Sequence, residues 1–325
     1  PIIFTIYTIH KYTHDNFKLW NDFISKAKNA TFLFHRDFMD YHSDKFEDFS
    51  LMVFKNKKLI AVLPANRKNN SLCSHQGLSY GGFVVSKNIR ILEYISAFSA
   101  LLRWLKSKGF SEIIIKQLPF IYNKHLAEEF EFLLRELDSR IIANNSYYVL
   151  DCLKQYKPNR NRLRGIKKAE RQMLLVETGM AFFWEHILSK NLIDKFGVKP
   201  VHTIEEISML QEKFPEQIKF FAAKSGDEIH AGVLLFITDH VVHFQYSSGM
   251  EDRDETGALD FLFHAIIKKF SHSKYISFGS AATDNTLKID QGLAYWKESF
   301  GAHIMPQRTY AIKTNKSINL EGIIK

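Results

Sequence analysis

Residues 218–279 read IKFFAAKSGDEIHAGVLLFITDHVVHFQYSSGMEDRDETGALDFLFHAIIKKFSHSKYISFG, and the period of the hydrophobic pattern changes along this stretch. Short apolar runs separated by turn-forming residues predict three strands, at residues 218–223, 229–238 and 241–247. A polar loop follows, and the apolar residues then recur at helical spacing over residues 258–270. Residues 275–279 predict a further strand. The order is therefore three strands, a helix and a strand.

The first half of the chain repeats this order. Its predicted elements are strands at 49–54, 59–65 and 71–76, a glycine-rich stretch at 76–82, a helix at 89–108 and a strand at 111–117. Further helices are predicted at 17–28, 182–194 and 203–214. We therefore predict an α/β fold of two domains, 1–153 and 154–325, in which the basic residues 154–171 form a linker or an exposed helix.

Several stretches resemble FemAB-like peptidyltransferases. In the second half they are HAGVL from His230, HFQY from His243, GALDFLF from Gly257, SFGS from Ser277 and QGLAYWKESFG from Gln291. In the first half they are LIAVLPA from Leu59, SHQGLSYGG from Ser74 and IKQLP from Ile115. The resemblance implies two tandem GNAT (acyl-CoA N-acyltransferase-like) domains with mixed α+β sheets. It also implies transfer of an acyl or aminoacyl group to an amine, without a covalent enzyme intermediate.

The donor site follows from the GNAT layout, in which a helix N-terminus faces phosphate because its orphan N–H groups favour anions. Arg253, Gly257 and Ala258 occupy that place, and Lys297 is placed to neutralise a donor phosphate, so that acyl-CoA is the expected donor. Four acidic residues within 251–255 oppose a pyrophosphate there. Aminoacyl-tRNA, held by the basic residues 154–171, is therefore a second candidate donor. A third interpretation is a non-catalytic module that binds nucleic acid or a membrane surface.

The candidate catalytic residues lie on the third strand of the second half. An attacking amine must lose a proton, which requires a base. His243, Gln245 and Tyr246 follow one another there, and strict alternation places His243 and Gln245 on one face of the strand. His202, just before a predicted helix, is a further candidate base. The alternative interpretation is a strand with one solvated face and a structural histidine.

Candidate acceptor-binding residues are spread over both halves. They are Arg36, His75, Gln76, Tyr80, Lys116 and Ser280. The planar fork of an arginine suits a phosphate or a carboxylate, although Arg36 is also placed to pair with Asp37 or Asp40. A glycine-rich loop after a strand is a common binding edge, although a tight turn explains it equally well. For Tyr80 the alternative interpretation is a buried structural residue, and for Lys116 it is a position at the edge of a strand.

The composition of the chain bears on its partners, its metal content and its location. The 325 residues carry a formal net charge of +9, which suits an anionic partner or serves only solubility. Two distant cysteines, without CxxC spacing, argue against a disulfide framework or a thiolate zinc site, and no metal is predicted. Without a leader-like or membrane-spanning apolar run, we expect a soluble cytoplasmic enzyme. Compact relatives of the family suggest an amino sugar or another cell-envelope precursor as the small-molecule amine acceptor.

Overall fold

The computed structural model describes residues 7–282, 287–315 and 318. Contacts divide the chain into unit 1, residues 1–144 and 307–325, and unit 2, residues 145–306. The predicted boundary at 153/154 is therefore corrected to 144/145, and the last residues belong to the first unit. The reason is strand β14 (His303–Lys313), whose second half pairs antiparallel with β7 (Glu112–Lys116) of unit 1. A hydrophobic pattern does not disclose such a partner because the two strands are far apart in the chain.

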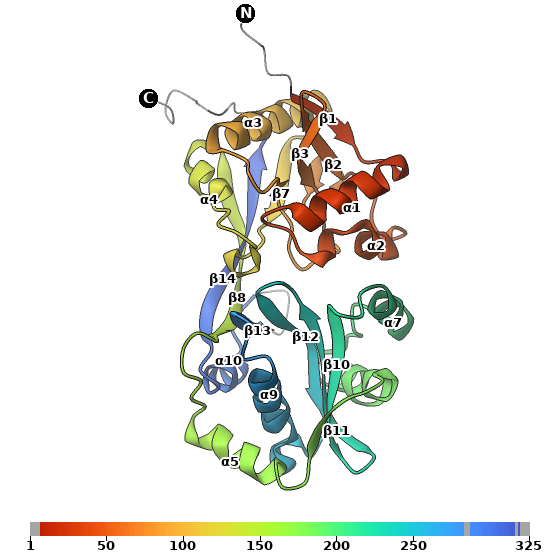
Figure 1. Ribbon diagram of the computed structural model, residues 1–325, viewed down its shortest axis with the longest axis vertical. Helices are drawn as coiled ribbons and strands as arrows, with labels where there is room; N and C mark the ends of the chain where they lie inside the picture. Colours follow the sequence, from red (N-terminus) through yellow and green to blue (C-terminus); the bar gives the residue numbers. More distant parts are fainter. Residues whose placement is uncertain (1–6, 283–286, 316–317, 319–325) are drawn as a thin grey trace, which may run out of the picture. The chain divides into compact units, whose positions relative to one another are not determined.

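Unit 1 contains two sheets (Figure 1). The first has the order β1-β2-β3-β6 and is antiparallel, and the second has the order β4-β5-β7-β14, in which β5 and β7 are parallel. The strands are β1 (Tyr7–Lys11), β2 (Leu51–Lys55), β3 (Lys58–Leu63), β4 (Asn66–Lys68), β5 (Ser71–Cys73) and β6 (Val84–Val85), with β7 as above. The predicted strand at 71–76 ends at Cys73, because the chain turns at His75, whose φ is +50°.

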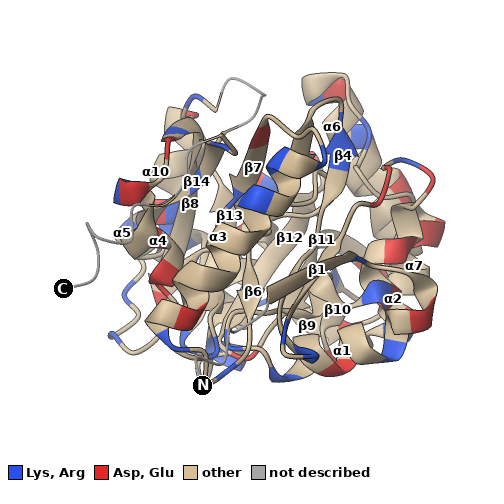
Figure 2. Ribbon diagram, turned by 90° about the horizontal axis from the view of Figure 1, so that it is seen from above, with Lys and Arg blue, Asp and Glu red and all other residues tan. Residues whose placement is uncertain are grey.

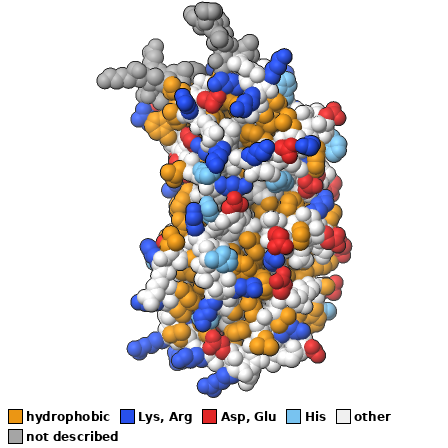
Figure 3. Space-filling view, in the orientation of Figure 1, with side chains coloured by type: hydrophobic (Ala, Val, Ile, Leu, Met, Phe, Trp, Pro, Cys, Tyr) orange, Lys and Arg blue, Asp and Glu red, His pale blue; other side chains and the backbone are white. Residues whose placement is uncertain are grey.

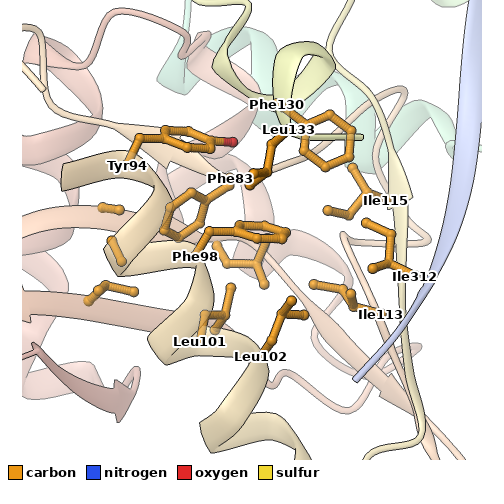
Figure 4. Packing of buried hydrophobic residues seen from close by; sticks show 14 of the residues in the cluster. Phe83, Tyr94, Phe98, Leu101, Leu102, Ile113, Ile115, Phe130, Leu133 and Ile312 are labelled. Atoms are coloured by element: carbon orange, nitrogen blue, oxygen red, sulfur yellow. The ribbon is translucent and has the colours of Figure 1, made fainter. Parts of the chain in front are cut away.

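The helices of unit 1 include the two long ones that the apolar spacing predicted. They are α1 (Phe17–Lys26), α2 (Arg36–Met39), α3 (Ile91–Ser107) and α4 (Glu129–Leu133), with short 3-10 turns at His14–Asn16, Phe32–Phe34, Asp40–His42, Phe120–Tyr122 and Leu134–Glu136. The buried side of α3 packs on β7 and β14, where Phe98 and Leu101 meet Ile113, Ile115 and Ile312 (Figure 4). This aromatic and aliphatic cluster holds the helix on its sheet.

Unit 2 has one mixed sheet with the strand order β8-β13-β12-β11-β10-β9. Only β12 and β13 are parallel neighbours in it. The strands are β8 (Ser139–Asp151, shared with unit 1), β9 (Leu174–Glu177), β10 (Ile218–Ser225), β11 (Glu228–Ile237), β12 (Val241–Gly249) and β13 (Tyr275–Ser280). The helix α9 (Ala258–Lys269) connects β12 to β13, so the predicted order of three strands, helix and strand is confirmed.

Helices cover both faces of this sheet. On one face, α9 packs Phe263 against Phe244 and Phe278. On the other face, the π-helical turn η6 (Phe183–Leu188) lies so close that a Cβ on Gly232 would approach the Phe183 ring to 2.4 Å. The remaining helices are α5 (Arg160–Ala169), α6 (Ser189–Phe196), α7 (Ile204–Lys213), the turn α8 (Arg253–Thr256) and α10 (Gln291–Glu298).

Residues 154–171 contain a helix that belongs to unit 2, so the linker interpretation is corrected in favour of the helix. The side chain of Asn159 caps α5 by accepting a hydrogen bond from the Arg162 amide, and Ile166 and Ala169 are buried beneath it. Arg162 forms an ion pair with Asp260 in the first turn of α9. The start of α7 has the capping box expected from its sequence, with Thr203 and Glu206 bonded reciprocally to backbone amides.

Among the described residues, no helix combines the length and apolarity needed to cross a bilayer. The same part of the chain holds no group of three or more His, Cys, Asp or Glu side chains arranged to bind a metal ion.

Candidate functional site

The two parallel strands of unit 2 separate towards their carboxyl ends. The ladder between β12 and β13 runs from Val241 opposite Tyr275 to His243 opposite Ser277 and ends there. Both strands continue, β12 to Gly249 and β13 to Ser280. Beyond the ladder, each strand has a β neighbour on its outer side only, which leaves a notch between them. Among the described residues, backbone groups beyond the ladder have no strand partner in this direction and are candidates to hold a carbonyl, although the Gly279 amide donates to Ser277 Oγ at 3.4 Å.

The equivalent parallel pair of unit 1 is closed by its own loop. After the β5–β7 ladder, Ser74 Oγ accepts a hydrogen bond from the Lys116 amide at 3.0 Å. The Gly81 amide donates to the Lys116 carbonyl at 2.6 Å, and the Leu118 amide donates to the Gly81 carbonyl at 3.0 Å. The backbone groups that a substrate would use are therefore already bonded within the chain. This difference makes the notch of unit 2 the candidate active site.

A β-bulge changes which side chains of β12 point towards the site. Phe236 pairs with His243, Leu235 with Phe244 and Leu234 with Tyr246, so Gln245 is the extra residue. Because Phe236 and Leu234 share a face of β11, His243 and Tyr246 share a face of β12. The prediction that His243 and Gln245 share a face is therefore wrong. The Gln245 Oε1 atom is buried and accepts no hydrogen bond from the described residues.

His243 lies at the origin of the notch. Its Nδ1 is 3.0 Å from Ser277 Oγ, its ring stacks on Tyr147 of β8, and its Cε1 lies 3.6 Å from where a Cβ on Gly279 would be. Burial, reinforced by the charge of Lys297, lowers the pKa of His243 to about 4. The imidazole is therefore uncharged at neutral pH and is able to accept a proton.

The low pKa of His243 predicts a loss of stability in acid. Its folded pKa lies below the unfolded value of 6.5, so the unfolded chain binds the proton more tightly and stability falls as the pH drops from about 6.5 to about 4. His243→Gln should flatten this part of the curve of unfolding free energy against pH. Burial also lowers the pKa of His75 to about 3. His75 therefore makes its own contribution to the loss of stability in acid, and this contribution remains in the His243→Gln variant. Parallel curves for the two proteins would contradict the assignment.

Tyr246 and His202 form a pair on the same face of the sheet. The Tyr246 hydroxyl lies 2.8 Å from His202 Nδ1, and its ring packs edge-on against Trp184 of η6. Burial raises the pKa of Tyr246 to about 12, so the phenol stays protonated at neutral pH. The predicted catalytic residues His202, His243 and Tyr246 thus all belong to unit 2, and the last two lie on one strand face.

Lys297 is buried, with 5 % of its surface exposed, and its ammonium donates a hydrogen bond to the carbonyl of Ser280 at the end of β13. Desolvation lowers its pKa to about 7. The Ser280 hydroxyl donates to Asn145 Oδ1 at 2.5 Å and accepts from the Ala282 amide at 2.9 Å. Lys297 therefore lies beside the notch, where its ammonium is bonded to the Ser280 carbonyl; its predicted role of neutralising a donor phosphate stays a prediction.

The N-terminus of α9 is covered by α5. Gly257 and Ala258 are buried, and a Cβ on Gly257 would lie 2.3 Å from the Gly165 carbonyl oxygen. Thr256 Oγ1 already accepts a hydrogen bond from the Ala258 amide. Arg253 belongs to the turn α8, among the acidic residues Asp252, Asp254 and Glu255. The positive φ of Gly257, +73°, thus serves helix packing, and the geometry does not support a pyrophosphate cradle at Arg253, Gly257 and Ala258.

Two of the predicted acceptor-binding residues in unit 1 have structural roles. Arg36 is buried, donates to Ser50 Oγ, pairs with Asp40 and with Asp48, and lies 4.0 Å above the Tyr12 ring. Its fork is therefore occupied inside the protein and is not available to a substrate. The Tyr80 hydroxyl donates to Thr31 Oγ1 at 3.2 Å in the interior.

The other three predicted acceptor-binding residues of unit 1 are His75, Gln76 and Lys116. They lie in or beside the loop that bridges the parallel strands of unit 1. His75 is buried against His42 and Phe46, and its Nδ1 accepts from the Gly77 amide. Gln76 is held by the side chain of Asn66 through both its amide and its Oε1. Lys116 donates to the Leu78 carbonyl at 2.9 Å, and burial lowers its pKa. These contacts stabilise the loop.

Three residues of the site were not predicted from the sequence. Tyr147 and Asn145 come from β8, which shows no clear alternation of apolar and polar residues, and Ser277 is a small residue within a strand. The only sequence signal was the SFGS stretch, in which Gly279 adopts a φ of +70° where β13 shifts register against β8.

No family model matches this chain, and no curated protein matches it. Solved structures do. FemX is 12 % identical, with a TM-score of 0.63 over 94 % of this chain and 96 % of its own. L-PGS from Bacillus licheniformis is 11 % identical, with a TM-score of 0.53 over 97 % and 96 %. A tandem GNAT protein of the clavulanic acid pathway is 7 % identical, with a TM-score of 0.52 over 96 % and 99 %. The chain therefore has the FemX-like tandem GNAT fold.

Proposed function

We propose that the protein is an N-acyltransferase whose chemistry takes place in the notch between β12 and β13 of unit 2. The observation that carries this proposal is the separation of the two strands after His243 and Ser277, with a buried lysine beside the opening. The matching strands of unit 1 are bridged by Ser74 and Gly81, which argues for a single reaction site.

The reaction forms a C–N bond between an acceptor amine and the acyl carbon of the donor, and breaks the bond from that carbon to the donor's sulfur or oxygen. An alkyl ammonium with a pKa near ~10 costs roughly 4 kcal/mol to deprotonate at pH 7. In the proposed mechanism, Ser277 orients His243 through Nδ1. After the ammonium has lost one proton to water, the neutral amine attacks; the other ring nitrogen then takes the second proton, which is acidic in the tetrahedral adduct, and passes it to the leaving group.

The tetrahedral intermediate carries an oxyanion, which needs positive charge or donors that are already in place. The ammonium of Lys297, held on the Ser280 carbonyl, supplies that charge in the proposed mechanism. Its site is poorly solvated, so the attraction is stronger than it would be in water. The phenol of Tyr246, bonded to His202, is the proposed donor for orienting the acceptor on the same strand face.

The donor is either an acyl-CoA or an aminoacyl-tRNA, and one observation favours the second. A conventional acyl-CoA site needs the N–H groups of the helix after the first parallel strand, and here Gly165 of α5 packs on that helix terminus. Acidic residues of α8 surround the approach. FemX and L-PGS share the fold, and the acceptor we propose is the amine of an amino sugar or of another cell-envelope precursor.

Ligand titrations can distinguish the two donors. A ligand that binds only the folded state raises the melting midpoint, by about 2.7 kcal/mol of stabilisation at a hundred times its Kd. We expect no shift with acetyl-CoA and a salt-sensitive shift with aminoacyl-tRNA. Transfer to an amine acceptor is then followed in a single turnover. A saturable rise of the melting midpoint with acetyl-CoA would instead identify a thioester as the donor. If His243→Gln does not slow the transfer, the proposed site is excluded.

A further inference from the structure

One face of α5 is exposed and strongly basic. Arg160, Arg164 and Lys167 recur at helical spacing and are exposed, as is Lys168, while Ile166 and Ala169 on the opposite face are buried. Leu163 lies among these cations with 38 % of its surface exposed. The side chains of Arg160, Leu163, Arg164 and Lys167 help to line a depression on this face. We call these five exposed side chains, from Arg160 to Lys168, the α5 face.

Among the residues that the structure describes, none forms an ion pair with a cation of the α5 face. Residues 154–171 include eight Lys or Arg and a single acidic residue, Glu170. Of these cations, Arg162 forms an ion pair in the described part of the chain, and its partner is Asp260. Arg162 lies off the α5 face. In Figure 3, Lys and Arg side chains gather at the lower left of the view, the region in which Figure 1 draws α5. Elsewhere in unit 2, α7 carries Glu205, Glu206 and Glu212 (Figure 2). The two helices thus have opposite charge.

Exposed leucines accompany the basic residues. In addition to Leu163, Leu153 before the helix is 80 % exposed and Leu174 after it is 72 % exposed. Single exposed leucines are common on protein surfaces, so they bear on a partner here only together with the cations of the α5 face. Single-stranded nucleic acid is held by aromatic stacking as well as charge, whereas aliphatic side chains among lysines and arginines suit the boundary of headgroups and acyl chains in a membrane.

We propose that the α5 face binds the surface of a membrane that contains anionic phospholipids. The cations contact lipid phosphates, and Leu163, flanked by Leu153 and Leu174, enters the interface between headgroups and acyl chains. This association would bring unit 2 to acceptors carried by lipids, but it does not depend on the acyl-transfer reaction. Its test therefore uses no substrate.

The experiment is co-sedimentation of the whole chain with vesicles of equal parts phosphatidylglycerol and phosphatidylcholine. We expect binding to these vesicles, little binding to pure phosphatidylcholine, and weakening as salt rises. Each basic residue near an anionic surface contributes about fivefold to the affinity. Arg164→Glu with Lys167→Glu should therefore lower the affinity at least about twentyfold. Leu163→Ser should lower it at every salt concentration, because its contribution is not electrostatic.

A matched control reverses two exposed cations elsewhere in unit 2, Lys195→Glu with Lys213→Glu, and should retain more binding than the α5 double variant. Melting curves of all variants check the fold, and Arg164→Gln with Lys167→Gln replaces any double reversal that does not fold. The proposal is overturned if the chain ignores anionic vesicles, if both double variants weaken binding equally, or if RNA is bound through α5 while vesicles are not.

Discussion

Lys297→Met is expected to remove most of the acyl-transfer activity and, at the same time, to raise the free energy of unfolding. Loss of a preorganised charge at an oxyanion slows such reactions by about 10² to 10³. The stability gain arises because the wild-type ammonium is desolvated in the folded state, where its pKa is about 7. A methionine of similar volume removes that cost, which we put at about 1–3 kcal/mol at neutral pH. Single-turnover rates and denaturant unfolding measure the two effects.

The sign of the pH dependence gives a second readout. Between pH 7 and 10.5 the unfolded lysine holds a proton that the folded one has lost, so the wild-type protein gains stability as the pH rises through this range. The variant should lack that rise. Lys268→Met, which removes an exposed lysine of α9, should leave both activity and stability close to wild type. If Lys297→Met loses activity and stability together, the residue serves the fold alone.

Gly257→Ala is expected to lower the free energy of unfolding by about 2–4 kcal/mol. The added Cβ requires an L-residue to hold a φ of +73° and places a carbon 2.3 Å from the Gly165 carbonyl oxygen. Because the atoms that the Cβ meets belong to the backbone of Gly165, α5 has to move away from α9. Chemical denaturation measures the loss, and Gly179→Ala, where a Cβ meets nothing within 4 Å, should stay within about 0.5 kcal/mol of wild type.

The same variant tests the role of the α9 terminus. If Gly257 were needed for the approach of a donor pyrophosphate, Gly257→Ala would weaken acyl-CoA binding and leave stability nearly unchanged. The packing of α5 on α9 predicts the reverse, because a Cβ on Gly257 would meet the backbone of Gly165, and a Cβ on Gly165 would meet the side chain of Asp260.

The structure places some of the predicted site residues in the candidate site of unit 2 and gives others internal partners in unit 1. His243, Tyr246 and His202 were recognisable because polar side chains interrupt an apolar strand or precede a helix. Arg36 and Tyr80 looked equally suitable, yet their polar atoms are bonded to Asp40, Asp48 and Thr31 inside unit 1. A sequence shows which groups can form hydrogen bonds, but the partners of a buried group are set by chain segments that pack together from distant positions.

The sequence by itself determined the core order of three strands, a helix and a strand in each half, because the periods of 2.0 and 3.6 residues are local properties of the chain. From this order and its motifs, the tandem GNAT fold could be predicted. The strands β1, β8, β9 and β14 were not predicted. Only the tertiary structure decided that the second half of β14 joins unit 1 and that a bulge at Gln245 turns Tyr246 to the same face as His243. Among the described residues, it also decided that a loop bridges the parallel strands of unit 1, whereas the β12–β13 ladder ends at His243 and Ser277. Each of these depends on register between distant strands, and a shift of one residue turns every side chain to the other face.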